Sequence, residues 1–273
     1  MGSGVIFRGH TPEQPPPDIA DALASAASRL GSFGRHFIWF AEVTSTNDVA
    51  AMLAETGAAE GTVVSAEAQT AGRGRLGRVW ISPPMAGLYV SLLLRPPVHV
   101  AQLVTIAAGA AVSEGIEAAT GLNTGVKWPN DVHVSGRKVA GILAEAGTSG
   151  DGGQHVVLGF GINVMPAAYP PDIARRATSV EGELGRQVDR GAVLSECLAA
   201  FATHYECLRA HEHPQVLDAW RRRASTSLGR PVEWDANGSL HRGFAEDLDE
   251  RGALLVRTDR GVERVISGEV RWI

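Results

Sequence analysis

The sequence predicts an α+β fold in which a mixed β-sheet is flanked by helices and a small C-terminal β-barrel follows. Short apolar or alternating runs, typical of strands, alternate with longer helical patterns up to about residue 226. From Leu228 onward, short strand-like runs alternate with glycine-containing turns. The 273 residues are enough for one large core and a smaller second module. We therefore expect an N-terminal extension (1–37), a main domain (38–226) and a barrel (227–273).

Each expected strand is an aromatic, β-branched or continuously apolar run bounded by turn residues. HFIWFAE (36–42) is an example of the first kind, and GLYVSLLL (87–94) is a continuous apolar run that indicates a buried strand. Ser135-Gly136 has the composition of a two-residue hairpin turn. The expected strands are residues 36–42, 61–68, 87–94, 132–134, 138–145 and 155–164, the last of these as a strand pair or a bent strand.

The expected helices are set by their start and stop signals. TPEQPPPD (11–18) is typical of a linker, because consecutive prolines remove backbone donors. Ser, Thr, Asn and Asp at 45–48 are preferred N-cap residues, and Gly57 and Gly121 are suitable stops. The expected helices are residues 18–34, 49–57, 98–120 and 190–225, the last interrupted at Pro214.

Composition and charge exclude several classes of protein. The net charge of −5 gives no general attraction to polyanions. Cys197 and Cys207 lie in one expected helix without a surrounding Cys/His cluster, which argues against a zinc site around them and favours a reducing compartment. No apolar run approaches the roughly 20 residues of a membrane helix, and the N-terminus lacks the apolar core of a signal peptide. We therefore expect a cytoplasmic protein.

The stretch GRGRLGR (72–78) contains the G-x-G-x-x-G pattern of a dinucleotide-binding loop. Such a loop must open a helix, because the helix N-terminus holds the pyrophosphate. Here Val79-Trp80-Ile81 is β-like and Pro83-Pro84 blocks a helix, which argues against a dinucleotide site. One arginine–glycine unit in an acidic chain is also weak support for nucleic-acid binding. Two interpretations remain: a solvated basic hairpin, or a mobile loop whose arginines close over a phosphorylated ligand.

The stretch KWPND (127–131) places a lysine close to two oxygen-bearing side chains. Asn130 and Asp131 offer the oxygen ligands that Mg²⁺ prefers, although a turn around a buried tryptophan would look the same. Lys138 follows seven residues after Asp131, inside an apolar run. A lysine is rarely placed there for packing and needs a partner, for which a ligand carboxylate is suitable.

Five segments, taken in their order along the chain, carry a resemblance to a known family. They are STN (45–47), EAQTAGRGRLGRVW (67–80), KWPNDV (127–132), RKVAGILAE (137–145) and GFGINV (159–164). Together they resemble the biotin–protein ligases, over roughly residues 38–273. The resemblance implies the mixed-sheet fold that these ligases share with class II aminoacyl-tRNA synthetases, with an SH3-like C-terminal barrel.

The reaction implied by the resemblance has two steps. The biotin carboxylate attacks the α-phosphate of ATP, which gives biotinyl-5′-AMP and pyrophosphate. A specific lysine of the biotin carboxyl carrier domain of acetyl-CoA carboxylase, or of a related carboxylase, then attacks this mixed anhydride and AMP leaves. Because the carboxylate is already ionised at pH 7, the first step needs cations and Mg²⁺ more than a general base.

The resemblance also implies roles for individual residues. Biotin is expected at Ser45, Thr46, Asn47, Gln69, Arg73, Gly74, Arg75, Lys138 and Gly141. ATP or the adenylate is expected at Arg75, Arg78, Trp80, Lys127, Asn130 and Asn163, with adenine against Trp80. Arg73, Arg75 and Lys138 would be the catalytic cations, and Asn130 and Asp131 would hold the metal. Gly141 and Gly161 would allow a ligand to approach closely.

Other expectations concern partners and alternatives. Some biotin–protein ligases carry an N-terminal winged helix that binds operator DNA, and the roughly 37 residues before the match are too few for one. We therefore expect a monofunctional ligase, monomeric or homodimeric, that binds neither DNA nor membrane. The alternative is a lipoate or octanoate ligase or transferase of the same fold, against which GRGRLGR and KWPND favour biotin. A non-catalytic biotin- or nucleotide-binding module would not need Lys138 together with the arginines.

Overall fold

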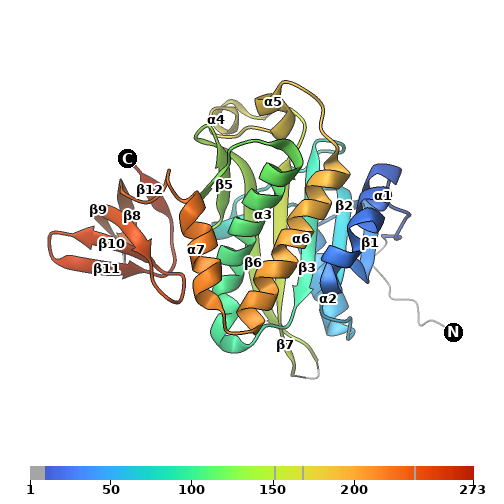
Figure 1. The fold of residues 1–273 in the computed structure, drawn as a ribbon, viewed down its shortest axis with the longest axis horizontal. Helices are drawn as coiled ribbons and strands as arrows, with labels where there is room; N and C mark the ends of the chain where they lie inside the picture. Colours follow the sequence, from blue (N-terminus) through green and yellow to red (C-terminus); the bar gives the residue numbers. More distant parts are fainter. Residues whose placement is uncertain (1–9, 151, 168, 237) are drawn as a thin grey trace.

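A mixed seven-stranded sheet organises the computed structural model, which describes residues 10–150, 152–167, 169–236 and 238–273 (Figure 1). Its strands are β1 (Phe37–Val43), β2 (Val63–Gln69), β3 (Gly87–Leu94), β4 (Gly125–Lys127), β5 (Asp131–Val134), β6 (Arg137–Thr148) and β7 (Gln154–Asn163). The spatial order is β1-β2-β3-β7-β6-β5-β4. β1 and β2 are parallel and the other neighbours are antiparallel. β3 and β7 pair from Gly87 opposite Asn163 to Leu94 opposite Val156.

Helices cover both faces of this sheet. They are α1 (Pro17–Ala26), α2 (Thr46–Glu55), α3 (Val104–Thr120), α4 (Pro171–Ala174), α5 (Val180–Leu184), α6 (Arg190–Arg209) and α7 (His213–Arg223). α3, α6 and α7 lie side by side over one face, where they form the larger hydrophobic core with α1 (Figure 1). α2 covers a smaller cluster on the other face. Val63 joins the first cluster and Val64 the second, because successive strand residues point to opposite faces.

The C-terminal module is a five-stranded antiparallel sheet. Its strands are β8 (Arg230–Ala236), β9 (Ser239–Leu248), β10 (Leu254–Thr258), β11 (Gly261–Val265) and β12 (Val270–Trp272), in the order β11-β10-β9-β8-β12. Arg221 of α7 ion-pairs with Asp247 at 2.6 Å, and the Trp128 indole donates to the Gly252 carbonyl at 2.9 Å. The predicted α+β class with a small C-terminal β module is confirmed. The expected Asn237-Gly238 turn includes Asn237, which lies outside the described residues.

Several predicted elements differ in their limits. Residues 98–120 begin as a 3₁₀ segment, η4 (Val98–Leu103), before α3, which ends at the left-handed Gly121 as expected. The helix predicted at 18–34 ends at Ala26 and continues as two 3₁₀ turns, η1 (Ala27–Arg29) and η2 (Gly31–Gly34). Pro214 lies in the first turn of α7, because proline is tolerated there, so the break precedes it. Residues 154–163 form one strand.

The expectation that no apolar run approaches the length of a membrane helix was wrong. Val98–Thr120 is a helical segment of 23 residues whose most apolar window has a mean hydropathy of 1.2, which meets the length and composition of a membrane span. Of this segment's most apolar window, 72% is buried inside the protein, because α3 packs against the sheet and against both α6 and α7. The apolar character therefore belongs to a core helix.

We predict that Gly115→Ala destabilises the protein by about 1–3 kcal/mol, because α3 and α6 pack without space for a methyl group. A Cβ on Gly115 would lie 2.5 Å from the Cα of Cys197 in α6. The control is Gly109→Ala on the same helix, where the nearest atoms of Trp220 would lie 3.8 Å away. That variant should be neutral or more stable by up to about 1 kcal/mol, since alanine is the better helix former. Urea denaturation measures both, and equal stabilities would refute the packing argument.

Candidate active site

A cavity of about 610 Å³ opens at the edge of the sheet where β1, β2 and β7 end and β3 begins. The loop with the sequence GRGRLGR (72–78), called the arginine loop below, and residues of the C-terminal module border it. The structure brings all the residues to which the sequence assigned a ligand into its lining: Ser45, Thr46, Asn47, Gln69, Arg73, Gly74, Arg75, Arg78, Trp80, Lys127, Asn130, Asp131, Lys138, Gly141 and Asn163. These residues come from segments up to 118 positions apart, Ser45 to Asn163, so only the fold places them together.

One part of the lining is a hydrogen-bonded network that starts at the N-terminus of α2. Gln69 Oε1 accepts from the Thr46 backbone N–H at 2.8 Å and from its Oγ1 at 3.1 Å. The Gln69 carboxamide then donates to Ser82 Oγ at 2.9 Å. Ser45, the first of the four candidate N-cap residues, is the N-cap residue of α2, which therefore begins at Thr46, three residues before the expected start, yet the Ser45 side chain makes no capping hydrogen bond. Its buried hydroxyl therefore remains available at the cavity wall.

Asn47 extends this network across the sheet. Ser91 Oγ on β3 donates to Asn47 Oδ1 at 2.6 Å, and Asn47 Nδ2 donates to Glu145 Oε2 on β6 at 2.5 Å. Gly159 on β7 leaves the space that the carboxamide fills, because a Cβ there would overlap it. Asn47 is buried, so these bonds fix its orientation. This region thus presents uncharged donors and acceptors in fixed positions.

Arg73 is tied to the same region by two carboxylates. It lies 2.7 Å from Asp48 Oδ1 and 3.2 Å from Glu145 Oε2. The hydrogen bond to Asp48 is the main cause that raises the pKa of Arg73, while partial burial opposes it and Glu145 adds to the increase. The sequence assigned Arg73 and Arg75 to one target. In the structure both line the cavity, and Arg73 is in addition ion-paired with Asp48 and Glu145.

Arg75 and Lys127 are different, since neither has a carboxylate partner within ion-pair distance in the described part of the chain. Arg75 reaches Asn130 Oδ1 and the Gly268 carbonyl, both at 3.4 Å. Lys127 Nζ lies over the Trp272 ring, 4.6 Å from its centroid. Burial lowers the pKa of both side chains, and the charge of Asp131 only partly offsets it. Two half-buried cations thus face the cavity without a full counter-charge.

Lys138 is held by the hairpin that joins β5 and β6. Ser135 and Gly136 form its turn, both with positive φ (50° and 77°), as the type I′ geometry requires. The Lys138 ammonium lies 2.6 Å from Asp131 Oδ1 and 5.3 Å from the centroid of the Trp80 ring. Burial works to raise the pKa of Asp131, but the neighbouring His133 and Lys138 hold it below its ordinary value. The partner that Lys138 needed is therefore present within the protein.

Trp80 packs against a pair of glycines in the sheet. Gly141 on β6 and Gly161 on β7 are directly paired. A Cβ on Gly161 would lie 2.5 Å from Trp80 Cε2, and one on Gly141 would lie 3.0 Å from Trp80 Cζ3. The sequence assigned these glycines to close ligand approach, and in this structure the indole occupies that space. The buried Trp80 Nε1 has no hydrogen-bond partner among the described residues.

The C-terminal module completes the cavity. Gly268, Glu269 and Val270 line it. Glu269 ion-pairs with Arg78 at 2.6 Å, and this hydrogen bond is the main cause that lowers the pKa of Glu269. The arginine loop is therefore fastened to a segment almost 200 residues later in the chain, Gly268 after Arg75.

Sequence reasoning missed four residues that position the site: Asp48, Glu145, Glu269 and Trp272. Asp48 directly follows the segment STN and Glu145 ends the segment RKVAGILAE, so an acidic residue at the end of a motif segment was the available signal. Glu269 and Trp272 belong to the C-terminal module, where no pattern connected them to the arginine loop. Only the fold makes that connection.

Comparisons with known proteins agree with this arrangement. Residues 39–163 match the model of the biotin/lipoate A/B protein ligase family, and residues 227–271 match that of the biotin protein ligase C-terminal domain. The bifunctional ligase/repressor BirA of Bacillus subtilis is 34% identical over 270 residues, or 96% of this chain and 82% of BirA. The biotin–[acetyl-CoA-carboxylase] ligase of Mycobacterium tuberculosis is 34% identical over 93% of this chain and 96% of that protein.

A solved structure extends the similarity to the fold. The biotin protein ligase from Aquifex aeolicus, in complex with biotin and ATP, has a TM-score of 0.76 and 32% sequence identity to this chain. The match covers 88% of this chain and 99% of the Aquifex protein. The relatives and the solved structure match both the mixed sheet and the C-terminal module, so the chain belongs to the biotin protein ligase family.

Proposed function

We propose that this protein is an ATP-dependent biotin–protein ligase. It activates biotin as biotinyl-5′-AMP, releases pyrophosphate, and transfers biotin to a lysine of the biotin carboxyl carrier domain of acetyl-CoA carboxylase or a related carboxylase. The named activities of the relatives and the Aquifex complex with biotin and ATP support this proposal. The proposed catalytic domain spans residues 38–226, and the C-terminal module, 227–273, closes one side of its cavity.

The observation that carries the proposal is the pair of half-buried cations without carboxylate partners. A buried charge is costly unless it is paired, so a cavity that holds Arg75 and Lys127 in this state suits an anionic ligand. Lys138 lies near Lys127, and Asp131, which ion-pairs with Lys138 at 2.6 Å, also acts on the charges of Lys127 and Arg75. The carboxylate of biotin and the phosphates of ATP are anions that fit this end of the cavity.

The network around Asn47 and Gln69 suits the other end of biotin. The ureido ring of biotin presents N–H donors and a carbonyl acceptor, and the wall at Ser45, Thr46 and Asn47 offers uncharged groups of both kinds. Because these groups are fixed by their own hydrogen bonds, they need little reorganisation on binding. Biotin would thus extend from this network towards the cations.

The first step forms a bond between a biotin carboxylate oxygen and the α-phosphorus of ATP, and it breaks the bond to the β-phosphate. Negative charge builds up on the phosphate oxygens. The positive charges of Arg75, Lys127 and Lys138 stabilise it electrostatically, without any proton transfer. In the second step the acceptor lysine's amine attacks the biotinyl carbonyl, the amine loses a proton, and AMP leaves with the bonding electrons. Closure of the arginine loop excludes water from the adenylate between the steps.

The donor set agrees with a magnesium ion held mainly by the nucleotide. Mg²⁺ usually takes one or two protein carboxylates together with phosphate oxygens, and Asp131 supplies one carboxylate in the lining. Asp131 Oδ1 is ion-paired with Lys138, and Asn130 Oδ1 accepts a hydrogen bond from Arg75. Asn130 is the weaker candidate for a metal ligand, because its amide oxygen is uncharged. Bound there, the ion would neutralise part of the triphosphate charge.

The rest of the proposal concerns location and partners. Both cysteines are free, which is typical of a reducing compartment, and we propose a cytoplasmic location. We include no DNA-binding function, since residues 10–36 hold one α-helix and two 3₁₀ turns rather than a winged helix. For the oligomeric state we propose a monomer or a homodimer.

A lipoate or octanoate ligase is the competing function, because the family model over residues 39–163 covers both kinds of enzyme. The match of residues 227–271 to the biotin protein ligase C-terminal domain supports biotin. The dithiolane ring of lipoate would also offer no hydrogen bond to the buried Ser45 hydroxyl at the cavity wall. Pyrophosphate release from ATP with either acid tests this: we expect release with biotin, and release with lipoate alone would overturn the proposal.

We predict that Lys138→Ala lowers biotin-dependent pyrophosphate release by about 100-fold or more, because one cation is lost where charge develops. The control is Arg137→Ala, the adjacent residue, whose guanidinium pairs with Glu183 at 2.6 Å outside the cavity. That variant should keep its activity within about threefold. Thermal unfolding monitors the fold of both. Normal release by a folded Lys138→Ala protein would contradict the role.

We predict that Arg75→Gly lets biotinyl-5′-AMP escape, because the loop loses its contacts to Asn130 and Gly268. Bystander proteins added to the reaction should then become biotinylated on exposed lysines. The control is Leu76→Gly, which adds a glycine to the same loop but removes only an exposed side chain in the left-handed region (φ 56°). Equal bystander labelling by both variants would contradict this role, because it would show that the rigidity of the loop, rather than the arginine, retains the adenylate.

A further inference from the structure

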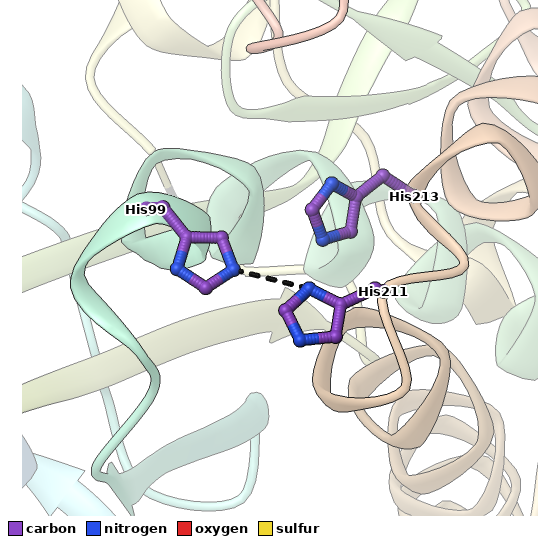
Figure 2. Close-up of side chains that lie close together, drawn as sticks. All are labelled: His99, His211 and His213. Atoms are coloured by element: carbon purple, nitrogen blue, oxygen red, sulfur yellow. Dashed lines mark hydrogen bonds between the residues drawn. The ribbon is translucent and has the colours of Figure 1, made fainter.

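Three histidines from separate parts of the chain meet on the surface (Figure 2). They are His99 in η4, His211 in the turn between α6 and α7, and His213 at the start of α7. Their rings point towards one another, and one ring nitrogen from each lies within 4.8 Å of those of the other two. His99 Nε2 and His211 Nδ1 are only 3.3 Å apart.

This histidine cluster is separate from the ligand cavity. The cavity lies where β3 begins, next to Asn163, whereas η4 follows the opposite end of β3 at Leu94. Eight strand residues span about 23 Å, so the two places lie at opposite edges of the sheet. None of the three histidines lines the cavity. The cluster therefore has no part in the proposed reaction.

One feature of the cluster is costly without a ligand. The Nε2 atom of His213 is buried and has no hydrogen-bond partner among the described residues. An ion bound between the rings would supply that partner. His211 also has a φ of +63°, a left-handed conformation that is uncommon for residues other than glycine.

We propose that His99, His211 and His213 form a binding site for a divalent transition metal ion, with Zn²⁺ as the preferred ion and water as the fourth ligand. Tetrahedral zinc with Zn–N distances near 2.05 Å places ligand nitrogens about 3.4 Å apart. The His99–His211 pair already has nearly this spacing, and rotation of the exposed rings brings in the third nitrogen. Zinc then replaces the hydrogen bond between those two rings.

The bound ion would link η4 to the start of α7. α7 carries Arg221, which ion-pairs with Asp247 of the C-terminal module. The site therefore fastens the helix on which that module rests to the turn that precedes α3. Its effect is on stability, because only the folded chain brings the three imidazoles together.

Equilibrium dialysis of the tag-free protein against ZnCl₂ tests the site. We expect one Zn²⁺ per chain with a micromolar or tighter Kd, and a higher thermal midpoint when zinc is in excess. His211→Gly should weaken binding at least about tenfold and abolish the thermal shift, while the glycine relieves the positive φ and keeps the fold. His99→Gln, which removes a ligand from the other element, should do the same.

Two controls keep the result interpretable. His36→Gln removes an exposed histidine outside the cluster and should leave zinc binding and the thermal shift unchanged. Cys207→Ser should also leave zinc binding unchanged, which would exclude the partly exposed thiol as the zinc ligand. Absence of stoichiometric binding by the unaltered protein would overturn the proposal. So would equal zinc affinity in the unaltered protein and both cluster variants.

Discussion

The central constraint on this structure is the cost of holding Arg75 and Lys127 half-buried without carboxylate partners. Elsewhere in the cavity the protein neutralises its cations itself: Arg73 by Asp48 and Glu145, and Lys138 by Asp131. Those internal pairs fix the side chains in place. Arg75 and Lys127 have no such partner and therefore attract an anionic ligand most strongly, and Lys138, held in place by Asp131, adds its charge at the same end of the cavity.

The sheet makes this arrangement possible through its glycines. β6 and β7 approach the cavity with Gly141, Gly159 and Gly161, and the freed space is filled by Trp80 and the Asn47 carboxamide. The indole and the carboxamide, which come from a loop and a helix, thus pack directly against the backbone of the strands. The C-terminal module then fixes the open side, with Glu269 on Arg78 and Trp272 against Lys127. Residues remote in sequence therefore set the environment of both unpartnered cations.

Much of the fold could be predicted from local pattern, because strands such as Gly87–Leu94 are continuous apolar runs and Ser135-Gly136 has typical hairpin chemistry. The limits of Val98–Thr120 could not, since a switch from 3₁₀ to α-helix depends on tertiary packing. Its identity as a core helix also needed the fold, because length and hydropathy alone do not distinguish a core helix from a membrane helix.

For the site, the five motif segments predicted the residues that line the cavity, but not their pairing. Which carboxylate neutralises which cation is a long-range property: Glu145 lies 72 residues from Arg73. The histidine cluster is the extreme case, since 112 residues separate His99 from His211 and no spacing pattern links them. Cys197 and Cys207 are free, and neither belongs to this cluster.

Intact-mass measurement of a biotin carboxyl carrier domain, after incubation with this protein, biotin, ATP and Mg²⁺, tests the central claim most directly. The account predicts one added biotinyl group on the acceptor lysine, with no addition when either biotin or ATP is omitted. An unchanged carrier mass in the presence of folded protein, both substrates and Mg²⁺ would contradict it.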